Sequence, residues 1–351
     1  MSVRAIELPP AVTNDHPDNE HQGEQMTTTT GDNGGSATRR RFDGKVVLIT
    51  GAARGQGREE AVRFAAEGAN IIGVDLAAQL DSIPYPMATP EDLATTVAMV
   101  EAAGGAMVSR AADVRDLAAL EGAVAEGLDR FGRLDIVVAN AGVMATSLFT
   151  ELSEQAWDEI VGTNLTGVWK TVRAAAPAIM AGERGGSVVI TSSIAGLKGM
   201  WVSAPYVASK HGVTGLMKTM ALELSPNNIR VNSIHPSSVR TPMIENDYFA
   251  NMMRGDLDNP TFEDTASVLN PMQALDLPWL ESSDIANAVL WLCSDEARGI
   301  TGVSLPVDGG NMLMGRGNPA SHQPSPNPSR TEQPPPPAAR PSGPHLPTPG
   351  P

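Results

Sequence analysis

Tyr206 and Lys210 are the residues whose types and spacing point most directly to chemistry. They lie in the segment Tyr206-Val-Ala-Ser-Lys210, so in a helix both side chains project from one face. A free tyrosine, with a pKa of about 10, accepts protons poorly at neutral pH, but a neighbouring ammonium favours the phenolate. The pair therefore predicts an acid/base that interconverts an alcohol and a carbonyl. A solvated helix pair is the plain alternative, and the surrounding motifs favour the catalytic interpretation.

Two polar residues upstream of the pair suit the same chemistry. Ser193 follows the apolar run Val188–Ile190, which predicts a buried strand, and open α/β sheets bind ligands at the carboxyl ends of their strands. Asn164 lies within a helical pattern from about Glu154 to Met180. A polar side chain there could hold a water molecule behind the lysine.

A glycine-rich turn must position a second ligand group. Residues 46–49 predict a strand, residues 50–57 a turn, and residues 58–67 a helix. Glycines let the backbone approach a phosphate, and the helix N-terminus offers free N–H groups and the positive end of its dipole. The turn therefore predicts a dinucleotide site, with the candidate residues Gly51, Arg54, Gly55, Gln56 and Gly57.

Asp75 indicates which dinucleotide binds. It ends the predicted strand 70–74, where an acid can accept hydrogen bonds from the ribose hydroxyls and repels a 2′-phosphate. Arg54 argues the other way, because a basic residue in the turn could meet that phosphate. The charge of Asp75 opposes the phosphate directly, so the sequence favours NAD over NADP.

Together these motifs resemble the short-chain dehydrogenase/reductase family over about residues 41–314. The family's Thr-Gly-x3-Gly-x-Gly turn matches residues 50–57. The resemblance implies a single Rossmann-type α/β domain, a doubly wound parallel sheet with helices on both faces. It also implies that Tyr206 takes the hydroxyl proton, Ser193 binds the same oxygen, and Lys210 binds the nicotinamide ribose. The implied catalytic set is Asn164, Ser193, Tyr206 and Lys210.

The resemblance implies further cofactor contacts along the chain. The family's Asn-Ala-Gly motif is present, its adenine-contacting acid matches Asp113, and Thr241 matches the residue that holds the nicotinamide carboxamide. The family's Pro-Gly pair is Pro236-Ser237 here, so the glycine is replaced. The remaining implied cofactor contacts are Leu76, Val114, Asn140, Ala141, Gly142, Pro236, Val239, Tyr206 and Lys210.

An insertion at about residues 77–90 carries a narrower resemblance. A plain βαβ connection needs two to six residues, and this segment is longer and holds three prolines, at positions 84, 86 and 90. With the glycine turn it resembles the mycofactocin-associated, carveol-dehydrogenase-like subgroup. That resemblance implies a cover over the cofactor, with NAD held tightly and re-oxidised by mycofactocin. A tolerated surface insertion is the alternative.

A long segment at about residues 242–282 is expected to close over the substrate. Loops of this length in a compact domain are usually functional, and methionine fills irregular apolar space. No cluster of arginine or lysine marks an anionic substrate, so we expect a neutral, apolar, terpenoid-like secondary alcohol. Ordinary core packing is the alternative for some of the expected lining residues, Met144, Met200, Trp201, Met243, Phe249, Met252, Met253, Met272 and Trp279.

Composition limits the remaining possibilities. Residues 1–41 and 315–351 are too poor in apolar side chains to form a core and are predicted to be disordered, which leaves one domain at 42–314. The translation start is either Met1 or Met26. The 25 basic against 40 acidic residues disfavour nucleic acid and anionic membranes. No apolar stretch could span a bilayer.

The few cysteines and histidines add two expectations. The single cysteine, Cys293, agrees with a reducing cytoplasm. Only His211 and His235 accompany it in the predicted domain, so no metal site is expected.

The sequence thus predicts an NAD-dependent alcohol dehydrogenase, expected as a homotetramer. An NADPH-dependent ketoacyl-type reductase is the alternative within the enzymes. A dinucleotide-sensing protein without activity is the alternative outside them, since a fold does not fix a function.

Overall fold

The computed structural model describes residues 40–314. The predicted disorder of residues 315–351, and of residues 1–39 within the predicted N-terminal extension, lies outside them. Arg40 and Arg41, which were assigned to that extension, belong to the described unit. Arg41 forms an ion pair with Glu67, and the neighbouring Phe42 packs edge-on against Phe64 at 4.7 Å between ring centroids.

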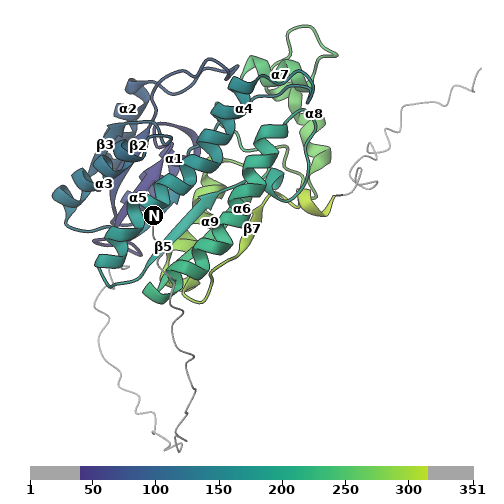
Figure 1. Cartoon of the computed structure of the whole chain (residues 1–351). Helices are drawn as coiled ribbons and strands as arrows, with labels where there is room; N and C mark the ends of the chain where they lie inside the picture. The colour runs from purple at the N-terminus through teal and green to yellow at the C-terminus, as the bar shows by residue number, and fades with distance from the viewer. Residues whose placement is uncertain (1–39, 315–351) are drawn as a thin grey trace, which may run out of the picture. The chain divides into compact units, whose positions relative to one another are not determined.

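A seven-stranded parallel sheet forms the centre of this unit (Figure 1). The strand order is β3-β2-β1-β4-β5-β6-β7, and every neighbouring pair is parallel. The order reverses between β1 and β4, where ligands bind in open α/β sheets. The strands are β1 (Val46–Thr50), β2 (Asn70–Asp75), β3 (Met107–Ala111), β4 (Ile136–Ala139), β5 (Gly186–Thr191), β6 (Ile229–Pro236) and β7 (Ser304–Val307).

Strand β1 explains why both faces of the sheet are covered. Alternate strand residues point to opposite faces, and in β1 all five are buried. Val46 and Leu48 pack into one hydrophobic cluster, whereas Val47 and Ile49 pack into another. A strand buried on both sides reads as a continuous apolar run, as parallel sheets require.

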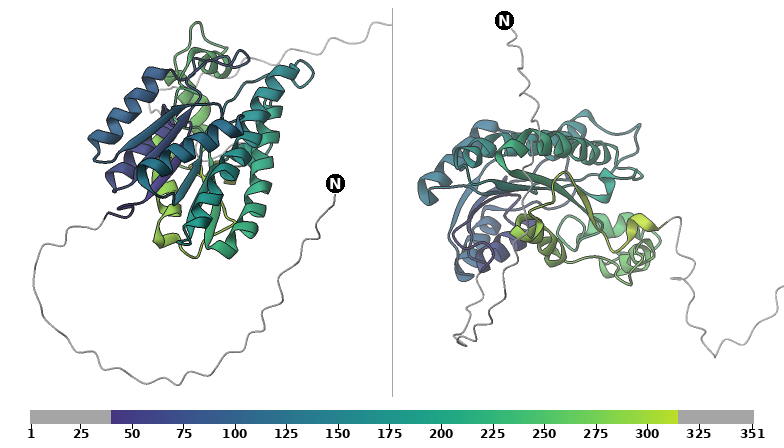
Figure 2. Two further views of the ribbon diagram at one scale, coloured as in Figure 1. Left: turned by 60° about the vertical axis from the view of Figure 1, so that its left-hand side comes forward. Right: turned by 90° about the horizontal axis from the view of Figure 1, so that it is seen from below.

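Helices complete the two layers (Figure 2). Helices α3 (Leu117–Phe131), α5 (Gly167–Ala181) and α6 (Ala204–Leu224) contribute to the cluster around Leu48. Helices α1 (Gly55–Ala66), α2 (Pro90–Ala102) and α9 (Ser282–Cys293) contribute to the cluster around Ile49. The predicted doubly wound α/β sheet is therefore confirmed.

Some predicted boundaries differ from the structure. Helix α1 begins at Gly55, three residues before the predicted start, because the glycines of the turn already form its first turn. The predicted helix 154–180 divides into α4 (Glu154–Val161), a π-helical turn (Gly162–Thr166) and α5. The predicted strand Val188–Ile190 is longer in the structure, where β5 spans Gly186–Thr191.

The two predicted loops contain more structure than expected. Pro90 starts α2 rather than ending the insertion, because Thr89 is the N-cap of this helix and forms a capping box with Asp92 in its first turn. The segment 242–282 contains α7 (Asp247–Met253), α8 (Ala266–Leu269) and two turns of 3-10 helix, Glu263–Thr265 and Asn270–Met272.

Among residues 40–314, no helix is long and apolar enough to cross a membrane.

Candidate active site

A cavity of about 890 Å³ opens at the carboxyl ends of the strands, over the point where the strand order reverses. Thr50 of β1 pairs with Ala139 of β4, and the two segments that follow line this cavity. All but two of the predicted site residues line it. The exceptions are Gly57 and Asn164, which support the site from behind.

The glycine turn has the geometry of a phosphate cradle. Gly51 and Gly55 adopt φ values of +70° and +55°, which disfavour residues with a side chain. A Cβ at Gly57 would lie 2.2 Å from the carbonyl oxygen of Gly51, so only glycine fits there. No side chain caps the N-terminus of α1, and its first turn holds no acid. Its free N–H groups therefore remain available to an anion.

The carboxylate of Asp75 is held in place at the end of β2. One of its oxygens accepts a hydrogen bond from the N–H of Ala53 at 2.9 Å, and the other accepts from Ala77 at 3.0 Å. Each oxygen keeps a free lone pair, so the carboxylate can still accept from a diol. Arg54 lines the same cavity, and burial lowers the pKa of its guanidinium.

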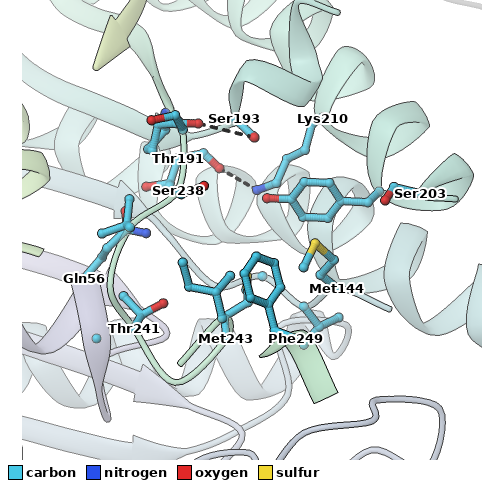
Figure 3. Close-up of a pocket in the computed structure, with 18 of the residues that line it drawn as sticks. Gln56, Met144, Thr191, Ser193, Ser203, Lys210, Ser238, Thr241, Met243 and Phe249 are labelled. Carbon is cyan, nitrogen blue, oxygen red and sulfur yellow. Dashed lines mark hydrogen bonds between the residues drawn. The ribbon is translucent and has the colours of Figure 1, made fainter. Parts of the chain in front are cut away.

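Lys210, Tyr206 and Ser193 come together at the other end of the cavity. Lys210 Nζ donates a hydrogen bond to the carbonyl oxygen of Thr191 at 2.7 Å, which Figure 3 shows, and lies 5.5 Å from the ring centroid of Tyr206. The Ser193 hydroxyl lies near the carbonyl oxygen of Pro236 at 3.4 Å and accepts from the N–H of Ala195 at 3.1 Å. All three side chains are buried in the wall of the cavity.

Burial controls the proton affinities of this group. It raises the pKa of the Tyr206 hydroxyl, and the interaction with Ser193 opposes that rise only in part. It lowers the pKa of the Lys210 ammonium to about 8. The expectation that Lys210 lowers the pKa of Tyr206 is thus not met in this structure. The ammonium points toward the Thr191 carbonyl rather than the phenol, and desolvation of the phenolate dominates.

Asn164 acts as a clamp. It is fully buried in the π-helical turn, where its amide accepts from the N–H of Val143 at 2.8 Å and donates to the carbonyl of the same residue at 2.9 Å. A Cβ added at Gly142 would lie 3.4 Å from Asn164 Oδ1 and 3.5 Å from Lys210 Nζ. The two polar groups therefore flank one small space, and the relay of protons through a water molecule stays a prediction.

The substrate side of the cavity is apolar. Met144, Met243 and Phe249 face the same space as Ser193 and Lys210 (Figure 3). Of the lining residues predicted for this side, only Trp279 is wrong, because it does not line the cavity and instead packs against Phe262 at 4.6 Å. The others that line it are Met200, Trp201, Met252, Met253 and Met272.

The insertion is tied into a compact structure. Gln79 Nε2 donates to the carbonyls of Leu80, Ile83 and Tyr85 at 3.0–3.3 Å, and its Oε1 accepts from the N–H of Met87. Leu80, Ile83 and Tyr85 are buried in the same hydrophobic cluster as Tyr206 and Phe249. The insertion thus packs against both the catalytic group and the substrate segment.

Two polar residues at the site, Lys198 and His235, were not predicted from the sequence to act there. Lys198 lines the cavity and donates to Asn311 Oδ1, and it is a single basic residue rather than a cluster of them. His235 is fully buried, with Nδ1 2.8 Å from the carbonyl oxygen of Ser193 and Nε2 2.8 Å from Ser233 Oγ, so it fixes the backbone of Ser193. In the sequence, the position of His235 directly before the predicted cofactor contact Pro236 was the feature that could have indicated this role.

No group of three or more histidine, cysteine, aspartate or glutamate side chains gathers within reach of a metal ion in the described part of the chain.

Comparison with known proteins places the chain among oxidoreductases. The family model described as "Enoyl-(Acyl carrier protein) reductase" matches residues 51–311. A (-)-trans-carveol dehydrogenase from Rhodococcus erythropolis is 48% identical over 78% of this chain and 99% of its own length.

Two solved structures extend the likeness to the fold. The carveol dehydrogenase from Mycobacterium avium in complex with NAD has a TM-score of 0.77 and 48% identity, covering 78% of this chain and 99% of that one. The short-chain dehydrogenase from Mycobacterium paratuberculosis bound to NAD has a TM-score of 0.72 and 43% identity, covering 78% of this chain and all of that one.

Proposed function

The chain belongs to the short-chain dehydrogenase/reductase family as an NAD-dependent alcohol dehydrogenase, and we propose that its substrate is a neutral, apolar secondary alcohol of terpenoid type. One observation carries the substrate class. The space that Ser193 and Lys210 face is walled by Met144, Met243 and Phe249. An apolar wall binds a hydrocarbon skeleton, while a few polar groups orient its hydroxyl.

The residues present fit NAD. The uncapped α1 N-terminus and the turn at Gly51 and Gly55 suit the pyrophosphate, and Asp75 suits an unphosphorylated adenosine ribose. Lys210 and Thr241 line the opposite end, where a nicotinamide ribose and carboxamide would be held. When bound, NAD supplies the hydride acceptor.

The protein's own residues bind the alcohol and move its proton. Ser193 hydrogen-bonds the alcohol oxygen and fixes it beside Tyr206. Tyr206 accepts the hydroxyl proton as the carbonyl forms, so its phenolate must be accessible at working pH. Burial disfavours that phenolate, and the side-chain interaction with Ser193 offsets part of the cost.

We further propose that the insertion holds NAD in the site and that mycofactocin re-oxidises it. Support comes from the packing of Leu80, Ile83 and Tyr85 against the catalytic cluster, and from the four hydrogen bonds of Gln79. Such contacts lower the rate of opening, and hence the escape of a covered cofactor. A homotetramer, and a cytoplasmic location argued from the single cysteine, stay predictions.

The test uses the full chain. Native mass spectrometry after extensive dialysis measures how much NAD stays bound, and turnover of carveol and cyclohexanol is then followed with added NAD and with an artificial redox dye. We expect retained NAD, turnover with the dye, and little turnover on added NAD alone. If bound NAD exchanges freely and added NAD supports full turnover, the proposal that the insertion traps the cofactor is wrong. Failure to oxidise any apolar secondary alcohol under either condition would remove the substrate proposal.

A further inference from the structure

A second cavity, of about 400 Å³, lies at the opposite edge of the sheet. It is bounded by the amino ends of three strands, through Ile136 of β4, Gly186 of β5 and Ile229 of β6. The C-terminal end of α9 closes another side, with Cys293 and Ser294. The carboxyl ends of the same strands bear the active site, so the two cavities lie at opposite strand ends.

The lining of this second cavity is cationic. Five basic side chains and two carboxylates line it, which leaves a net charge of +3. The whole chain carries a net charge of −15, so the cavity is positively charged in a protein that is negatively charged overall. The basic residues are Arg41, Lys45, Arg184, Arg230 and Arg298, and the acids are Asp135 and Asp295.

The acids on this wall do not neutralise it. Asp135 lies between two arginines, 2.6 Å from Arg133 and 3.7 Å from Arg184. Arg41 pairs with Glu67 outside the lining. Among the described residues, no carboxylate lies within 4.0 Å of the other three cations, Lys45, Arg230 and Arg298.

Arg230 is the fixed element of the cavity. Its guanidinium is partly buried and donates to the carbonyl oxygens of Leu292 at 2.7 Å, Ser294 at 3.2 Å and Ile300 at 3.3 Å. A guanidinium has five N–H groups, so two of them have no acceptor in the described protein. Carbonyl dipoles stabilise the cation and set its direction but do not cancel its charge. A rigid, charged donor pair in a concave wall is suited to an oxyanion.

We propose that this cavity binds a small phosphate-bearing dianion. Three cations that have no carboxylate partner among the described residues supply the charge, and the two N–H groups of Arg230 that have no acceptor there can donate to phosphate oxygens. A volume of about 400 Å³ holds a small molecule, and the acidic remainder of the surface excludes a nucleic-acid backbone. The bound ligand joins the N-terminal ends of β5 and β6 to the end of α9, and so stabilises the fold by mass action.

The test is calorimetric titration of the full chain with inorganic pyrophosphate at constant ionic strength. The protein is first saturated with NAD, so that the phosphate cradle at Gly51 is occupied. We expect one saturable site per chain and a rise in thermal midpoint that follows its occupancy.

A pair of double variants decides where the pyrophosphate binds. Lys45→Gln/Arg298→Gln removes two partly or fully exposed cations of the cavity and should weaken binding about 10-fold or more. The matched control, Arg130→Gln/Lys218→Gln, removes two exposed cations of α3 and α6 outside the cavity and should leave the affinity unchanged. Absence of saturable binding at millimolar pyrophosphate, or an equal loss in both double variants, would overturn the proposal.

Discussion

The backbone N–H of Met144 donates a hydrogen bond to the hydroxyl of Tyr85 at 3.2 Å. Tyr85 belongs to the insertion after β2, and Met144 follows the Asn140-Ala-Gly segment after β4. One buried contact thus joins the proposed cover of the cofactor to the wall of the substrate site. Tyr85 is 4% exposed, and burial raises the pKa of its hydroxyl to about 12, so it stays a neutral acceptor throughout the physiological range.

Tyr85→Phe removes this contact and keeps the ring. Loss of one buried hydrogen bond costs about 1 kcal/mol, so the thermal midpoint should fall by about 2–4 °C. The rate at which NAD is lost on dilution should rise several-fold. Tyr248→Phe is the matched control, because the Tyr248 hydroxyl contacts Thr146 on the substrate side and not the insertion. If both variants release NAD equally, Tyr85 has no special role in retention.

Tyr206→Phe should abolish turnover and leave NAD binding and folding nearly intact. The change removes the group that is proposed to accept the alcohol proton, and loss of a general acid/base costs about 10²- to 10⁴-fold in rate. Single-turnover kinetics measures the loss, and the thermal midpoint reports the fold. A variant that keeps the wild-type rate would show that another group accepts the proton.

Asp75→Ser should shift cofactor preference toward NADP. The carboxylate that opposes a 2′-phosphate is lost, while Arg54 in the same cavity remains to meet that phosphate. The ratio of dissociation constants for NADP and NAD should fall by about 10-fold or more, as expected for the loss of one like-charge contact of about 1.4 kcal/mol. The structural role of Asp75 is checked separately by the thermal midpoint. A wild-type protein that already prefers NADP would contradict the assignment.

The buried carboxyl group of Glu60 is expected to make the free energy of unfolding depend on pH. It is fully buried in α1, neither carboxyl oxygen has a hydrogen-bond partner in the structure, and burial raises its pKa from 4.5 to about 8. Between these two values the folded state holds a proton that the unfolded chain has released. The free energy of unfolding therefore falls as pH rises from about 4.5 to about 8, and this contribution levels off above that range.

Glu60→Gln should remove this contribution, because the amide keeps the shape of the neutral acid and cannot ionise. Thermal midpoints of both proteins from pH 5 to pH 9 provide the measurement. The variant should gain stability relative to the wild type as pH rises. Parallel curves for the two proteins would mean that Glu60 is not protonated in the folded state.

Residue types and their order along the chain determined the fold and most of the cofactor site. Strand β1 was predictable because a fully buried parallel strand needs an apolar run, and the glycines at 51, 55 and 57 were predictable because a turn this tight excludes a Cβ. These are local requirements, so each one produces a recognisable sequence pattern within a few residues. The fold class and the NAD preference followed from them.

Tertiary structure alone decided how the distant segments act on one another. Asn164 clamps Val143, Tyr85 reaches Met144, and Arg230 meets three carbonyls around the second cavity. The direction of the Tyr206 pKa shift also belongs here, because it depends on burial rather than on the four-residue spacing to Lys210. Such contacts join residues 21 to 70 positions apart, and the packing of the layers fixes them. Burial and side-chain direction are properties of that packing, so no local pattern in the chain encodes them.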